Sequence, residues 1–459
     1  MLEPMNRRWL TVAAGIGTLT AFGAGGVLLR APSGHGPVTV EARPDRPDLV
    51  VDELETRPPR TTRLGAEVFG VNEGLSLPQH GLTRAMSPSD RRTLQTRAQL
   101  LDQLGTSWVR VNSHGFGGLN MMQVQDDWAD SDALLSEIGV AGFSAVVVIG
   151  PWPGTKTGNY TSRYLPEDLD AYAAWVEATT RRYQGEGWPE IVWEVDNEPD
   201  LHNSEPPRGA KTKVKPGSFE TPAEYATVLL VTAAAIRRAD PDALVLSGGM
   251  YRAMTPKGRT YLERTLEQPG VRDAIDGISL HCYFAESELD PLYRLMAVSR
   301  QVAPDKPVWI TETSVPSDAA RAEIASEQWQ AEMVVAIHGA LLAEGADHIF
   351  WHTLFDAPAP VGGGPSGMRT NSLYRLVGDG VSHIEAKPSA ETYRRLAHHL
   401  ADQPLDTMQP EEGFLRFRDG VLVYEGVIET PADITTVEDL RTGEQRGATE
   451  QIEAPAWAF

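Results

Sequence analysis

The chain has 459 residues and a hydrophobic fraction of 41%, which is enough for one large domain with a small appendage and excludes a disordered chain. Its formal net charge of -22 excludes nucleic acid and anionic membrane surfaces as main partners, because both require clustered Lys and Arg. Cys282 is the one cysteine, so an internal disulfide and a multi-cysteine metal site are excluded as well.

The N-terminus has the pattern of an export segment. Arg7 and Arg8 precede an uncharged stretch over residues 9–29, which is long enough to span a bilayer as a helix. The Arg pair and the following Trp9-Leu10-Thr11 resemble a degenerate twin-arginine signal. We therefore expect an exported protein, periplasmic or extracellular, in which residues 1–30 are a cleaved signal peptide or a retained membrane anchor. A membrane is expected as a partner only through this segment, and a buried soluble helix is the remaining interpretation.

A Pro-rich, charged linker is predicted over residues 31–60, and eight strand-like runs alternating with amphipathic stretches follow it. The strands start roughly 30 to 50 residues apart, which is the size of a βα unit. This rhythm predicts an α/β fold, a (β/α)8 TIM barrel over residues 61–401. The alternative is an open doubly wound sheet, but no Gly-x-Gly-x-x-Gly turn follows the first strand. The predicted strands are 68–72, 108–112, 145–150, 191–195, 244–247, 277–283, 308–312 and 348–353, and the clearest predicted helices are 90–104, 166–183, 222–238 and 321–344.

The composition changes after a closing helix predicted at residues 389–400. Short alternating runs follow, and Asp419-Gly420 between two of them is a hairpin signal. Residues 402–459 are therefore predicted to form a small β appendage. This segment is too short for a typical carbohydrate-binding module, so we expect it to serve structure.

Two glutamates follow strand-like runs at their downstream ends. Glu198 stands in the run Asn197-Glu198-Pro199 after the strand 191–195, and Glu312 ends the strand 308–312. Because the downstream ends of barrel strands share one rim, both carboxylates are expected on that rim. Two carboxylates on one rim are the minimum equipment for cleaving a glycosidic bond. The sequence therefore predicts an enzyme that acts on carbohydrate.

With these motifs, residues from about 62 to 400 resemble a clan A glycoside hydrolase with a (β/α)8 barrel, most similar to glycoside hydrolase family 39 and its neighbours. In that clan an Asn-Glu pair ends the fourth strand and a Glu ends the seventh, and Asn197-Glu198 and Glu312 fall on the predicted strands four and seven. The resemblance implies a retaining glycosidase with no cofactor and no metal. Glu198 would be the general acid/base, which needs a raised pKa, and Glu312 the ionised nucleophile.

The resemblance also implies substrate-binding positions around this pair. Asn197 would contact the sugar's 2-hydroxyl, and Arg110 on the second strand would keep the nucleophile ionised. Tyr283 would donate a hydrogen bond to the nucleophile, and His281 would contact the sugar or the acid. Trp351 would stack beneath the sugar as an aromatic platform. Core packing is the alternative for His281 and for Trp351.

Glu194 lies four residues before Glu198, on the same strand face but deeper in the barrel. Its expected role is a structural ion pair with Arg110.

The substrate stays open. Asp196 and Thr313-Ser314 depart from the family's pattern beside the two glutamates, so a β-xylosidase-like activity is one option and an endo-acting hydrolase of an exopolysaccharide is another. Outside the enzymes, a catalytically inert barrel that binds glycans is the alternative. A metal-dependent hydrolase is disfavoured because no His-x-His pair marks the first strand. The sequence does not indicate the oligomeric state.

Overall fold

The computed structural model describes residues 64–72, 88–111, 119–120, 128–151, 165–166, 168–200, 221–283, 289–318, 325–355, 370–377 and 383–459. The predicted export segment over residues 9–29 and the predicted linker over 31–60 lie outside these ranges. Across the described ranges, no helix combines the length and the apolar character needed to cross a membrane.

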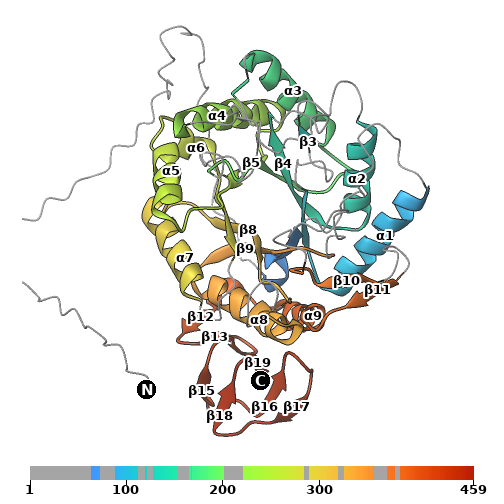
Figure 1. The fold of residues 1–459 in the computed structure, drawn as a ribbon, viewed down its shortest axis with the longest axis vertical. Coiled ribbons are helices and arrows are strands. Elements are labelled where there is room, and N and C mark those ends of the chain that lie inside the picture. The colour runs from blue at the N-terminus through green and yellow to red at the C-terminus, as the bar shows by residue number, and fades with distance from the viewer. Residues whose placement is uncertain are drawn as a thin grey trace, which may run out of the picture. The chain divides into compact units, whose positions relative to one another are not determined.

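Eight parallel strands form a sheet that closes on itself (Figure 1), in the order β6-β5-β4-β2-β1-β9-β8-β7. The two ends of this order meet through the bridges Leu246–Gly277 and Met250–Leu280. The predicted TIM barrel is thereby confirmed, and each predicted strand overlaps one observed strand. The strands are β1 (Phe69–Asn72), β2 (Trp108–Val111), β4 (Ser144–Gly150), β5 (Ile191–Asn197), β6 (Leu244–Gly249), β7 (Ile278–Tyr283), β8 (Val308–Ser314) and β9 (Ala346–His352), with a short β3 (Leu119–Asn120) paired to β4.

Helices surround the barrel, and several begin at a side-chain cap. Thr221, Thr255 and Ser326 each accept a hydrogen bond from the backbone N–H three residues further on. The cap at Ser326 explains why α8 begins at Glu327, later than the predicted position 321. The helices are α1 (Pro88–Gln103), α2 (Ala129–Val140), α3 (Leu169–Arg182), α4 (Pro222–Ala239), α5 (Pro256–Leu266), α6 (Val271–Ala274), α7 (Asp290–Val302), α8 (Glu327–Ala343) and α9 (Pro388–Leu400), with 3-10 helices η1 (Gly65–Val68) and η3 (Leu405–Thr407).

The barrel interior changes from apolar to polar along the strands. One buried apolar cluster comprises Trp108, Val146, Val192, Leu246, Trp309 and Phe350. Because strand side chains alternate, the next inward positions on three of these strands are Arg110, Glu194 and Thr311, all buried. The polar layer therefore lies toward the downstream ends of the strands, where barrel enzymes carry their sites.

The C-terminal region is an antiparallel β structure that follows α9, as predicted. A six-stranded sheet has the order β12-β13-β14-β19-β16-β17, and β15 pairs with β18. The predicted hairpin is confirmed, since Phe417 pairs with Gly420 across a turn at Arg418-Asp419. The strands are β12 (Gln409–Glu411), β13 (Phe414–Phe417), β14 (Gly420–Val423), β15 (Val427–Glu429), β16 (Thr436–Asp439), β17 (Gln445–Gly447), β18 (Gln451–Glu453) and β19 (Ala456–Ala458); a separate hairpin before α9 consists of β10 (Tyr374–Val377) and β11 (His383–Ala386).

Candidate active site

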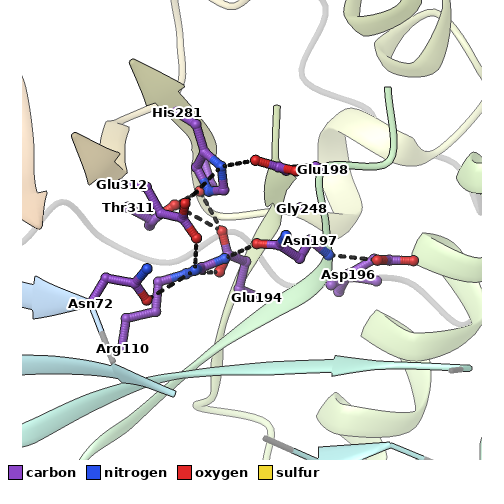
Figure 2. Close-up of polar contacts among 12 residues, drawn as sticks. Asn72, Arg110, Glu194, Asp196, Asn197, Glu198, Gly248, His281, Thr311 and Glu312 are labelled. Atoms are coloured by element: carbon purple, nitrogen blue, oxygen red, sulfur yellow. Dashed lines mark hydrogen bonds and ion pairs between the residues drawn. The ribbon is translucent and has the colours of Figure 1, made fainter. Parts of the chain in front are cut away.

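Glu198 and Glu312 lie together at the downstream ends of β5 and β8, the fourth and seventh strands of the barrel (Figure 2). One carboxylate oxygen of Glu198 lies within 4.8 Å of one of Glu312, and both lie within that distance of a His281 nitrogen. The Glu198 side chain is 16% exposed and the Glu312 side chain 6%. The more exposed glutamate is thus the one predicted to be the general acid/base.

A β-bulge directs Glu312 into the barrel. The pairing of β8 with both neighbours shifts register after Ile310, so that His281 pairs with Glu312 rather than with Thr311. The extra residue allows Thr311 and Glu312 both to make inward contacts, which strict alternation forbids.

The end of β5 is strained on either side of Asn197. Asp196 has φ 73° and Glu198 has φ 51°, a left-handed conformation that costs a side-chain-bearing residue about 1–2 kcal/mol. The Asp196 carboxylate accepts a hydrogen bond of 2.5 Å from the Asn197 N–H, and the Glu198 N–H donates to the Gly249 carbonyl at 2.9 Å. Such strain persists where surrounding contacts hold it, and it concentrates at functional sites.

Arg110 is the centre of the polar layer (Figure 2). Its Nε donates to Glu194 at 2.5 Å, as the predicted ion pair requires, and one terminal nitrogen donates to Glu312 at 2.6 Å. The remaining donors reach Asn72 at 3.1 Å and Asn197 at 2.7 Å. Burial lowers the pKa of Arg110, but the two carboxylates outweigh it and raise the pKa, so the guanidinium stays charged.

Glu194 is held from the side opposite the guanidinium. Ser279 Oγ donates to Glu194 Oε1 at 2.5 Å, and Thr311 Oγ1 donates to the same oxygen at 3.0 Å. These hydrogen bonds fix the deeper carboxylate, which in turn orients the fork of Arg110 toward Glu312.

His281 and Tyr283 on β7 contact the two glutamates. His281 Nδ1 lies 3.0 Å from Glu198 and 3.5 Å from Glu312, and the Tyr283 hydroxyl donates to Glu312. Burial lowers the pKa of His281, but the two glutamates outweigh burial and raise it overall. Gly249 makes room for the ring, because a Cβ there would lie 2.1 Å from His281 Nε2.

The surroundings of Glu312 hold its carboxylate ionised. Burial alone raises the pKa of Glu312, but the opposing causes, of which positive charge at His281 and then at Arg110 are the largest, bring the pKa well below its usual range. An ionised carboxylate with lowered basicity is suited to act as a nucleophile.

Trp351 is not at the site, so this prediction was wrong. Its side chain is fully buried, its ring stacks on His338 of α8, and its Nε1 donates to the Asn371 carbonyl at 2.8 Å. The phase of β9 is the reason: Trp351 faces the helix layer, and the next residue, His352, faces the interior, 4.0 Å from Glu312.

Two further residues of the site were not assigned from the sequence. His352 Nδ1 lies 2.6 Å from the side-chain nitrogen of Asn72 at the end of β1. In the sequence, Asn72 is the polar residue at the end of an apolar strand, and His352 is the residue after Trp351, on the opposite face of its strand. Glu73, which follows Asn72, lies outside the described ranges.

Glu198, His281 and Glu312 are close enough together to ligate one cation. The set fits a divalent cation poorly, because Arg110 already lies 2.6 Å from Glu312 and would face the ion across a buried space. His281 Nδ1, the atom a metal would need, faces Glu198 in a hydrogen bond. The arrangement is better suited to proton transfer and covalent chemistry.

Solved structures with the same fold include several glycoside hydrolases. A family 39 glycoside hydrolase from the gut symbiont Bacteroides cellulosilyticus WH2 is 16% identical, with a TM-score of 0.55 and coverage of 89% of this chain and 81% of that one. A family 39 β-xylosidase from Caulobacter crescentus is 18% identical, with a TM-score of 0.53 and 84% coverage of each chain. A glucosidase from Croceicoccus marinus is 12% identical, with a TM-score of 0.51 and coverage of 83% and 81%.

The sequence matches no protein-family model, and no curated protein matches it significantly. The structural similarities therefore define the fold: a (β/α)8 barrel of the kind found in family 39 glycoside hydrolases and related clan A enzymes.

Proposed function

We propose that the protein is a retaining glycoside hydrolase with Glu312 as nucleophile and Glu198 as general acid/base. The observation that carries this proposal is the closeness of the two carboxylates, whose oxygens approach within 4.8 Å. Retaining enzymes hold their carboxyl groups about 5–5.5 Å apart, whereas inverting enzymes leave room for water at roughly 6.5–9.5 Å. The family 39 enzymes that share the fold support the same class of reaction.

The reaction has two displacements. Glu312 attacks the anomeric carbon while Glu198 donates its proton to the leaving oxygen, which gives a covalent glycosyl-enzyme and a free alcohol. Glu198 then takes a proton from water, and the resulting oxygen nucleophile releases the sugar with its original anomeric configuration. Arg110 and Tyr283, which both hydrogen-bond to Glu312, keep this carboxylate ionised before attack and receive it as a leaving group afterwards.

A panel of fluorogenic aryl glycosides and secreted polysaccharides tests the activity. Glu312→Ala should lower kcat/KM on any active substrate by at least about a thousandfold. Glu198→Ala should cost about 10²–10⁴-fold with poor leaving groups and much less with activated ones, which need no acid. Glu263→Ala, in a partly exposed ion pair on α5, is the matched control and should retain activity.

Azide distinguishes the two roles, because it can replace either missing carboxylate. Glu312→Ala should form a glycosyl azide of inverted configuration, and Glu198→Ala one of retained configuration. Inversion in the wild-type reaction, followed by proton NMR of the first product, would contradict the retaining mechanism. Binding of a polysaccharide without turnover of any substrate would instead favour an inert glycan-binding barrel.

The same panel resolves the substrate. Turnover of aryl β-xylosides with exo release would place the protein beside the family's xylosidases. Cleavage within an exopolysaccharide would support an endo-acting enzyme that, with the export segment predicted at residues 1–30, works outside the cytoplasm.

A further inference from the structure

We infer that His352 is a specificity-determining residue: a neutral imidazole locked by Asn72 as a hydrogen-bond donor to an acceptor oxygen of the bound sugar. This inference rests on the proposed function, since it concerns the sugar held against Glu312. It is carried by a chain of hydrogen bonds from Arg110 through Asn72 to His352.

The first link fixes the amide of Asn72. Arg110 donates to the Asn72 side-chain oxygen at 3.1 Å, and a guanidinium has donors but no acceptor. The opposite amide orientation would place two donors against each other beside a charged group. The Asn72 nitrogen therefore points away from Arg110, toward His352.

The second link fixes the tautomer of His352. The Asn72 side-chain nitrogen can only donate, and it lies 2.6 Å from His352 Nδ1. That ring nitrogen must then be the acceptor, without a proton. In a neutral imidazole the proton is consequently on Nε2.

The charged groups near the ring do not overturn this assignment. Glu312 Oε2 lies 4.0 Å from Nδ1, beyond hydrogen-bond reach, and it already accepts a hydrogen bond from Tyr283, while Arg110 binds the other oxygen, Oε1. The Tyr283 ring meets the His352 ring edge-on, with centroids 5.8 Å apart. A proton on Nδ1 would have to displace the Asn72 nitrogen, which Arg110 holds in place.

The free donor is placed to meet the substrate. The His352 side chain is 13% exposed at the downstream end of β9, and Nδ1 is the ring atom engaged with Asn72 among the described residues. Arg110 and Tyr283 donate to Glu312 itself. In His352, Nδ1 lies 4.0 Å from Glu312 Oε2, and the Nε2–H is on the other side of the imidazole ring. It selects a ligand with an acceptor oxygen and disfavours one with a deoxy carbon or an ammonium group there.

The tautomer is read directly by NMR of the full chain labelled with ¹⁵N-histidine, with His352→Gln used to assign the signal. We expect a neutral ring with its proton on Nε2. Asn72→Asp, which is isosteric and still accepts from Arg110 but cannot donate, should move the proton to Nδ1 or charge the ring. A wild-type ring protonated on Nδ1 would overturn the inference, whether or not the protein turns over any glycoside.

Activity tests the donor role separately. Gln and Met are similar in size, but only Gln can donate from the far end, so His352→Met should fall below His352→Gln by roughly ten- to hundredfold in kcat/KM. Substrates deoxygenated at single positions then name the contact: one deoxy substrate should lose that factor in wild type but not in His352→Met. Equal losses in the two variants would show that His352 only fills space.

Discussion

One buried arginine satisfies two acids and two amides in this protein. Arg110 contacts Glu194, Glu312, Asn72 and Asn197, and its side chain is fully buried. Removing the guanidinium would leave two carboxylates buried without their counter-charge, a change that typically costs 3–5 kcal/mol. Lysine would restore the charge but not the planar fork that reaches four partners at once.

The stability contributed by Glu312 depends on pH in a direction that its pKa fixes. The folded-state pKa lies below the unfolded value of about 4.3, so the ionised group stabilises the fold above that pH. The contribution is lost as the pH falls toward the folded-state pKa. Glu312→Gln should therefore be less stable than wild type at pH 7, by on the order of 2 kcal/mol, and the gap should narrow toward pH 3.

Urea unfolding of both proteins at pH 7, 5, 4 and 3 measures that gap. Glu263→Gln, in a partly exposed ion pair with Arg259, is the control and should stay within about 0.5 kcal/mol of wild type at neutral pH. A gap for Glu312→Gln that widens as the pH falls would contradict the assignment of Glu312 as an ionised group.

The sequence predicts which segments contribute to this site better than it predicts which way each side chain faces. Arg110 and Glu194 were predictable as a pair because strand alternation holds in the lower barrel. The prediction placed Trp351 in the interior, where the next residue, His352, lies. Which residues of β9 face the interior is set by its pairing with β1 and not by its own sequence pattern. The bulge that turns Glu312 inward is likewise a product of register with β7 and β9.

Among the elements, α8 joins the barrel to the C-terminal sheet through a close approach at Gly339. A Cβ at Gly339 would lie 2.3 Å from Tyr424 Cβ, and Tyr424 is buried. Gly339→Ala should therefore destabilise the protein by about 1–3 kcal/mol, even though alanine normally favours a helix.

Measuring the free energy of unfolding of Gly339→Ala tests whether the substitution is destabilising. Gly447→Ala on β17 is the control, because nothing lies within 4 Å of a Cβ there, and it should be near neutral. If Gly339→Ala were as stable as wild type, the packing of α8 on Tyr424 would have to be looser than described.

Across the whole chain, the rhythm of strands and helices predicted a barrel, while the contacts that close it did not follow from any local pattern. The ends of the barrel order meet at β6 and β7 through long-range bridges, which no local signal encodes. The C-terminal sheet was predictable from a change of composition and from the hairpin signal Asp419-Gly420. Its attachment to the barrel was not, because that depends on contacts between segments far apart in sequence.

One set of apolar residues of the C-terminal sheet belongs to the barrel's hydrophobic core, while a second set forms a buried cluster of its own. Leu415, Leu422 and Trp457 belong to the same buried cluster as the barrel residues, and Trp457 stacks on His399 of α9 with centroids 5.1 Å apart. Arg441 also pairs with Glu332 of α8 at 3.0 Å. Deleting residues 402–459 would uncover this apolar surface, so the fragment ending at 401 should be insoluble or unfold at a lower temperature.

Calorimetry of the chain from residue 61 onward tests the same point. One transition is expected, with calorimetric and van't Hoff enthalpies in agreement, because a shared core couples the two regions. Two separate transitions, together with a soluble and active fragment ending at 401, would show that the C-terminal sheet folds as an independent unit.

Cys282 lies between His281 and Tyr283 on β7, fully buried, with burial raising the pKa of its thiol to about 12. Strand alternation turns it toward the helix layer, while its two neighbours face the carboxylates of Glu198 and Glu312. Since the chain has no second cysteine, a thiol reagent would label the protein at this one position. The rate of this labelling measures the local opening that exposes the Cys282 thiol. It therefore reports the stability of β7, whose His281 and Tyr283 contact Glu198 and Glu312, without an engineered probe.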